Sequence, residues 1–167
     1  MPEKAIPDSI EKVIRYINRT NEKTKDDLIT WGGLGITEFE DTDTICKQFK
    51  RIQTLYTRNG KFGRYIDHEY FSFSPDTEEL LYRESADIDQ IARKMAYDFY
   101  SLDHCQVVYA VHKSKNSPQN ESSKLHIHFA VNTVNINGKK RRENMRQTKE
   151  REERFNKIIS DRLASLP

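Results

Sequence analysis

Three of the five histidines fall on two neighbouring segments that have the composition of β-strands. His112 ends the first segment, and His126 and His128 lie two residues apart on the second. Because successive side chains of a strand point to opposite faces of the sheet, His126 and His128 share one face. If the two strands pair, His112 lies beside them, and three neutral imidazole nitrogens can surround one divalent cation. Three protein ligands leave positions for water or substrate, which is typical of a catalytic site.

A histidine pair of this spacing also occurs on solvent-facing strands that bind no metal. His112, together with the polar side chain of Asn132 on the same predicted face, favours the metal site, and Asn132 is the expected supporting residue behind the ligands. A closed structural zinc site is disfavoured, because Cys46 and Cys105 lack the spacing of zinc ligands. The N-terminus has no secretory signal, so both cysteines are predicted to be buried thiols without a disulfide.

Charge is segregated along the chain, although the formal net charge is only +2. All charged residues from Leu34 to Ile45 are acidic, and all those from Thr44 to Ile66 are basic. Aromatic residues interleave with the basic stretch, as in surfaces that hold phosphates and stack bases. The simpler interpretation is a solvated helix face with core aromatics. The candidate DNA contacts are Lys47, Lys50, Arg51, Arg58, Lys61, Arg64, Lys139, Lys140, Arg141 and Arg142.

Three stretches together resemble the plasmid relaxases, and most of all the MOBP-type mobilisation nucleases. Residues 125–132 (LHIHFAVN), with residues 108–112 (VYAVH) upstream, resemble the histidine motif of that family. Residues 15–17 (RYI) resemble its N-terminal tyrosine motif. Residues 68–76 (HEYFSFSPD) resemble its His-x-x-x-Ser-Phe-x-Pro stretch. The resemblance extends from about residue 10 to residue 163.

The resemblance implies a nuclease that nicks one DNA strand at a transfer origin by transesterification. Tyr16 is then the nucleophile, His68 is a proton-transfer or supporting group, and His112, His126 and His128 hold a divalent ion, Mn²⁺ or Mg²⁺. The implied product is a 5′-phosphotyrosyl adduct with a free DNA 3′-hydroxyl. The implied partners are single-stranded or hairpin DNA and, beyond the DNA, other relaxosome or secretion-coupling proteins of the bacterial cytoplasm.

Two departures from the family pattern keep other functions open. The family often has an acidic residue two positions after the first histidine, where this chain has Ser114, and the segment between His112 and His126 is long and polar. The alternatives are an HUH-type replication initiator or transposase, and a DNA-binding accessory protein without turnover. Tyr16 and His68 also have simpler interpretations, as an interfacial tyrosine and a structural strand histidine.

The hydrophobic pattern predicts the elements that must position these residues. Ile10, Val13, Ile14 and Ile17 follow the spacing of one helix face, and Tyr16 lies at the edge of that face. The Gly-rich residues 31–35 (WGGLG) are predicted to form a loop near the site. The predicted elements are a helix that begins at Pro7-Asp8-Ser9, a helix from Asp43 to about Tyr56, a strand from Arg64 to Phe73 followed by a turn at residues 74–76, a helix from about Ser85 to Tyr100, strands from Cys105 to His112 and from Leu125 to Asn135, and a helix from Arg146 to Leu163.

This order of elements predicts the α+β class: a largely antiparallel central sheet with flanking helices, in the two-layer sandwich of HUH relaxases. The chain of 167 residues is expected to form one nuclease domain over residues 1–167, either excised from a longer protein or unusually short. No window approaches the run of about eighteen apolar residues that a membrane-spanning helix needs, so membrane insertion is not expected.

Overall fold

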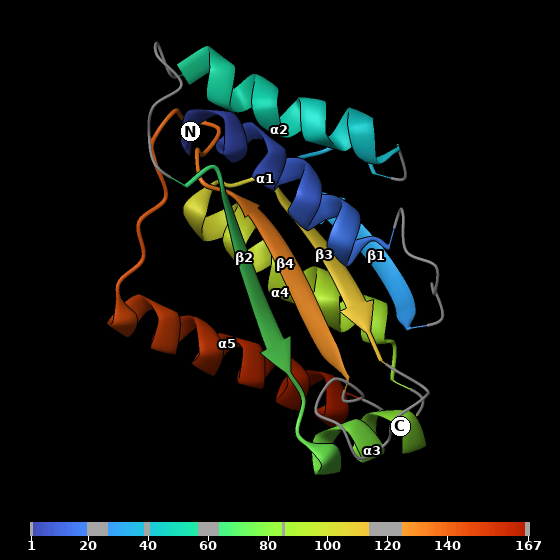
Figure 1. The fold of residues 1–167 in the computed structure, drawn as a ribbon. Helices are drawn as coiled ribbons and strands as arrows, with labels where there is room; N and C mark the ends of the chain where they lie inside the picture. The colour runs from blue at the N-terminus through green and yellow to red at the C-terminus, as the bar shows by residue number, and fades with distance from the viewer. Residues whose placement is uncertain are drawn as a thin grey trace.

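The computed structural model describes residues 2–19, 27–38, 41–56, 64–84, 86–113 and 125–165, with side chains described from Ile10 onwards. Within these ranges a four-stranded sheet forms the centre of the molecule (Figure 1). Its order is β1-β3-β4-β2, and each neighbouring pair is antiparallel. The strands are β1 (Leu28–Leu34), β2 (Ile66–Ser72), β3 (Val107–His112) and β4 (His126–Asn132).

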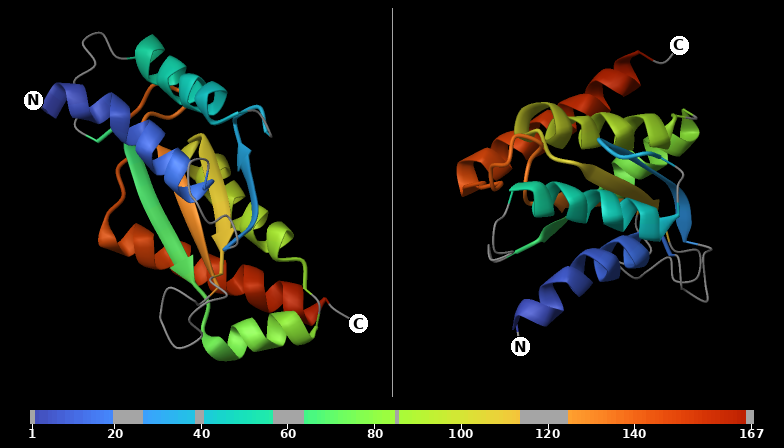
Figure 2. Two further views of the ribbon diagram at one scale, coloured as in Figure 1. Left: turned by 45° about the vertical axis from the view of Figure 1, so that its right-hand side comes forward. Right: turned by 90° about the horizontal axis from the view of Figure 1, so that it is seen from above.

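Helices cover both faces of this sheet (Figure 2). One face carries α1 (Pro2–Ile17) and α2 (Thr42–Tyr56), and the other carries α4 (Ile88–Asp103) and α5 (Met145–Ala164). The short helix α3 (Pro75–Arg83) follows β2 at one end of the sheet (Figure 1). The predicted α+β class with an antiparallel central sheet is confirmed. Because helices pack on both faces, the sheet is the middle layer of three, where two layers were expected.

Alternate residues of the central strands enter two separate cores. Val107 and Tyr109 pack with α4 and α5, whereas Val108, Ala110 and Ala130 pack with α1 and α2. The two alanines are small, so α1 can lie close to the middle of the sheet. His112 is two residues from Ala110 on β3, and His128 is two residues from Ala130 on β4. Both histidines therefore point to the same face as these alanines, the α1 side.

Three predictions of local structure are wrong. Helix α1 begins at Pro2 and not at Pro7, so the helix continues through a proline that has no backbone donor for it. Residues 74–76 do not form a simple turn: Ser74 accepts a hydrogen bond from the Thr77 N–H and caps α3, with Pro75 at its first position.

The Gly-rich residues 31–35 also differ from prediction, because most of them belong to strand β1. A Cβ atom at Gly32 would lie 2.8 Å from Cζ of Tyr109 on the neighbouring strand, so the glycine makes room for the large ring. Glycine here serves close packing within a sheet, whereas its composition indicated a loop. The prediction for the two cysteines is confirmed, because Cys46 and Cys105 are both buried and form no disulfide.

Candidate metal centre and active site

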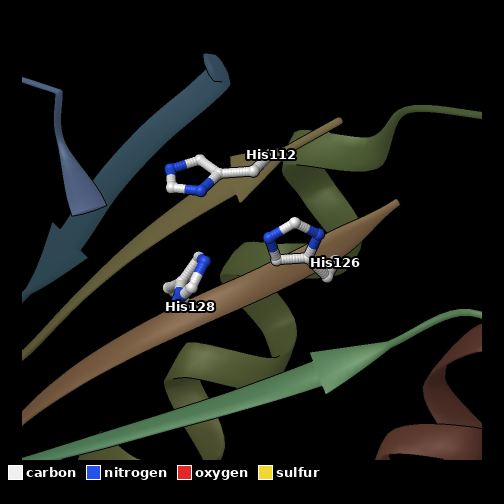
Figure 3. A group of neighbouring side chains, drawn as sticks. All are labelled: His112, His126 and His128. Atoms are coloured by element: carbon white, nitrogen blue, oxygen red, sulfur yellow. The ribbon is translucent and has the colours of Figure 1, made fainter. Parts of the chain in front are cut away.

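The antiparallel register of β3 and β4 brings the three histidines together (Figure 3). His112, the last residue of β3, pairs with His126, the first residue of β4, and His128 is opposite Ala110. One nitrogen from each imidazole lies within 4.8 Å of the other two. The ring centroids of His112 and His128 are 4.4 Å apart, and those of His126 and His128 are 4.8 Å apart. This spacing is short enough for one cation to bind all three.

Burial keeps two of these histidines neutral. His112 is fully buried, and burial lowers its pKa to about 4. His128 is 8% exposed, and burial, together with the nearby His112 and His126, lowers its pKa to about 2. A neutral imidazole has a free lone pair, which is the form that binds a metal ion.

Hydrogen bonds to other parts of the chain orient both rings. Nε2 of His112 donates to the carbonyl oxygen of Ile17 at 2.6 Å, so the lone pair of this neutral ring is on Nδ1. Nδ1 of His128 lies 2.8 Å from Nε2 of His68, while Nε2 of His128 is buried and has no hydrogen-bond partner in the described part of the chain. A buried nitrogen without a partner, next to two further histidines, fits a divalent cation.

Tyr16 lies against this cluster at the edge of α1. Ile10, Ile14 and Ile17 are fully buried and hold the helix to the sheet, whereas Tyr16 is 46% exposed. Its ring centroid is 5.8 Å from that of His128 and 6.1 Å from that of His68, both in edge-on geometry. The helical period therefore places a phenol beside the histidines and leaves it accessible from solvent.

Arg19 is a site residue that the sequence interpretation missed. It follows α1 with a left-handed backbone (φ 54°), and its guanidinium carbon lies 4.7 Å from the centre of the Tyr16 ring. Asp27 holds this guanidinium through two contacts of 3.1 and 2.7 Å. Nη2 of Arg19 also lies 3.3 Å from Nδ1 of His112. A fixed positive charge thus links the phenol to the histidine cluster, where it can bind a phosphate oxygen. Its position three residues after Tyr16 could have indicated this contact from the sequence, because side chains three residues apart on a helix are neighbours.

The nuclease-domain model of the relaxase family, described as MobA/VirD2-like, matches residues 16–162. The chain belongs to the relaxase family. The matched region begins at Tyr16 and includes His68 and the three clustered histidines. A search of curated proteins finds no match. Relaxase nuclease domains nick DNA and typically use a divalent metal, and the histidine cluster of this relaxase provides a place for one. Among the helices that the structure describes, none combines the length and apolarity of a membrane span.

Asn132 does not support the metal site of this relaxase, contrary to expectation. Its side-chain oxygen accepts from Gln53 at 2.8 Å, and its amide nitrogen donates to Gln106 at 2.8 Å and to the Phe49 carbonyl at 3.1 Å. These partners tie α2 and the start of β3 to the end of β4. Asn132 is therefore a structural residue at the opposite end of the strand from His126.

Arg141 must likewise be removed from the candidate DNA contacts. Its side chain is 4% exposed and forms ion pairs inside the protein. The paired carboxylates come from three different parts of the relaxase: Asp67, Glu69, Asp103 and Glu143. A guanidinium that is buried among carboxylates is not available to a phosphate.

The remaining basic candidates are distributed over two surfaces. Lys47 and Arg51 are exposed on α2, and Lys50 on the same helix pairs with Glu11. Arg64, Lys139 and Arg142 are exposed, and Lys140 is half-buried; Arg64 also contacts Asp67. Arg58, Lys61 and Ser114 lie outside the described residues.

Proposed function

We propose that this relaxase cuts one DNA strand at a specific site of a transfer origin, for conjugative mobilisation, with Tyr16 as the nucleophile. The observation that carries the proposal is the position of the Tyr16 ring, 5.8 Å from the ring of His128 in the histidine cluster. In the reaction the Tyr16 oxygen forms a bond to phosphorus, and the bond from phosphorus to the 3′-oxygen breaks. The products are a 5′-phosphotyrosyl adduct and a free 3′-hydroxyl.

His112, His126 and His128 would hold the divalent ion. Of the two ions predicted, Mn²⁺ suits three nitrogen ligands better than Mg²⁺, which prefers oxygen. A cation held there would align the phosphodiester and would offset the charge that develops in the transition state. The half-exposed Tyr16 can release its proton to solvent, and the departing 3′-oxygen takes one up.

His68 has a positioning role in this proposal. If His128 binds the ion through its orphaned Nε2, then its Nδ1 carries the proton and donates to Nε2 of His68. The single proton of neutral His68 is then on Nδ1, so neither of its nitrogens is free to accept the phenolic proton. Arg19 contacts both Tyr16 and His112, and we assign it to the phosphate of the reacting strand.

The DNA partner is single-stranded or hairpin DNA that follows the exposed basic residues Lys47 and Arg51, together with Arg64, Lys139, Lys140 and Arg142. Such contacts hold the backbone without reading sequence. Other relaxosome or secretion-coupling proteins are proposed partners of the same complex. The family match favours a relaxase over a replication initiator or transposase of the HUH type.

Two oligonucleotide pools that differ only in the labelled end test this chemistry. Each pool carries a random central region, and wild-type protein is incubated with it and Mn²⁺ before denaturing electrophoresis. The 3′-labelled pool should yield labelled protein, because the fragment with the new 5′-phosphate stays on Tyr16, whereas the 5′ label should be released. Tyr16→Phe should lose the adduct, and Tyr97→Phe on the opposite face should keep it. No adduct with the wild-type protein would favour the accessory DNA-binding function.

A further inference from the structure

Tyr70 is a largely exposed aromatic residue beside the histidine cluster. It lies on β2, and its Cα pairs with that of His128. The side chain is 70% exposed, and its ring centroid is 6.3 Å from that of His128 with an interplanar angle of 38°. Within the described residues no hydrogen bond engages its hydroxyl. The fold therefore makes little use of this ring, although it stands next to the site.

The position of β2 makes the ring accessible to a strand of DNA. β2 is an edge of the described sheet and pairs only with β4. The ring centroids of Tyr16 and Tyr70 lie 5.8 and 6.3 Å, respectively, from the ring centroid of His128. A phosphodiester held between Tyr16 and the histidine cluster would thus have an adjoining nucleotide within reach of Tyr70.

We propose that Tyr70 is the stacking platform for the nucleobase adjoining the phosphate that Tyr16 attacks. This inference rests on the proposed function and adds a base contact to the reacting end of the DNA. Stacking on the face of a ring tolerates any base, because every base has a π-face, so Tyr70 positions the strand without selecting its sequence. The ring carries this role, and the hydroxyl is not needed for it.

The binding of single-stranded DNA to two Tyr70 variants separates the contribution of the Tyr70 ring from that of its hydroxyl. The probe is a fluorescein-labelled oligothymidylate of twenty nucleotides, titrated at fixed salt with Mn²⁺ and followed by fluorescence anisotropy. Tyr70→Ala should bind about tenfold more weakly than wild type, and Tyr70→Phe should recover the affinity. Tyr97→Ala is the matched control, because Tyr97 is a tyrosine 56% exposed on α4, across the sheet from the site. Thermal unfolding of each variant confirms that it is folded.

Photocrosslinking locates the contact directly. An oligothymidylate with 5-iodouracil replacing single thymines should crosslink to the peptide that contains Tyr70, as mapped by mass spectrometry, and Tyr70→Ala should lose that product. Equal affinity of Tyr70→Ala and wild type, or crosslinks confined to other peptides, would overturn the stacking role. Loss of the covalent adduct in Tyr70→Phe would overturn it too, since the hydroxyl would then be the reacting group.

Failure of this inference is distinguishable from failure of the proposed function. An adduct on Tyr16 together with DNA binding that is insensitive to Tyr70→Ala removes only the stacking role. Binding that depends on the Tyr70 ring without any adduct removes the nicking reaction and leaves a single-stranded DNA contact.

Discussion

Nε2 of His68 lies 2.8 Å from Nδ1 of His128, so one of these imidazoles must donate to the other. The contact joins the edge strand β2 to the central strand β4, and it fixes the ring of His128 with its second nitrogen turned into the histidine cluster. Burial also lowers the pKa of His68, which favours the neutral form that can accept this hydrogen bond. The geometry of the centre therefore depends on a fourth histidine outside the three proposed ligands.

Removing His68 should weaken metal binding without abolishing it. His68→Ala deletes the acceptor that orients His128, and loss of such a supporting hydrogen bond typically lowers metal affinity by about 10- to 100-fold. Isothermal titration of Mn²⁺ measures the change. His68→Gln, whose amide oxygen can accept the same hydrogen bond, should recover part of the loss. Unchanged affinity in His68→Ala would show that His128 is held by its packing alone.

Mn²⁺ should bind at one site per chain in the wild-type protein, and His126→Ala should lose that site. Three nitrogen ligands are needed, and the substitution leaves two. The matched control is His104→Ala, because His104 is an exposed residue at the C-terminal end of α4, outside the cluster. Titration of metal-free protein measures both. Binding that survives in His126→Ala would place the ion elsewhere.

Arg141→Met should destabilise the fold strongly. The substitution removes the buried charge that pairs with Asp67 and Glu69, and breaking a buried ion pair typically costs about 3–5 kcal/mol. Urea unfolding gives the free energy. Arg142→Met, one residue further on and exposed, should change stability by no more than about 0.5 kcal/mol. Similar stabilities for the two variants would contradict the structural role assigned to Arg141.

Neutralising the outer face of α2 should reduce the salt dependence of DNA binding. Each backbone phosphate contact contributes a slope of about −0.7 to the logarithm of affinity against the logarithm of salt for single strands. Lys47→Gln and Arg51→Gln should therefore each flatten the slope by about that amount. Lys157→Gln, on α5 across the sheet, should leave it unchanged. Identical slopes for all the variants would remove α2 from the DNA contact.

The metal-free protein should lose stability as the pH falls below about 6.5, the usual pKa of an unfolded histidine. Burial lowers the pKa of His112 to about 4 and that of His128 to about 2. Between these values and 6.5 the unfolded chain binds more protons than the folded one, so low pH favours unfolding, by about 1.4 kcal/mol per pH unit for each group. This stability is fully present above pH 6.5. Urea unfolding at pH 7.5 and 5.5 in chelator measures it, and His128→Leu should show a smaller drop than wild type.

The parts of the site that follow from local periodicity were predictable from the sequence. Strand alternation placed His126 and His128 on one face, and helical spacing placed Tyr16 at the edge of a buried stripe. Helix α3 could also have been predicted from the sequence, since Ser74 and Pro75 form a recognisable helix start. Strand β1 was missed because glycine is common in loops, and the ring of Tyr109 that requires Gly32 comes from another strand.

Contacts between distant segments could not be predicted from the sequence. Arg141 belongs to a run of four basic residues, and only the fold surrounds it with carboxylates from β2 and α4. Asn132 continues the face of the histidines along β4, but Gln53 and Gln106 approach it from other elements and occupy its hydrogen bonds. The hydrogen bond between His68 and His128 depends in the same way on the pairing of β2 with β4.

The packing of α1 against the sheet would also resist mechanical force once DNA is joined to Tyr16. The covalent link would make the helix the anchor of the strand, and any pull on the DNA would pass from Tyr16 into the packed side chains of Ile10, Ile14 and Ile17. The hydrogen bond from Nε2 of His112 to the Ile17 carbonyl would join the end of this helix to the histidine cluster. Tension on the DNA would then be resisted by buried isoleucines that directly adjoin the centre that must later rejoin the strand.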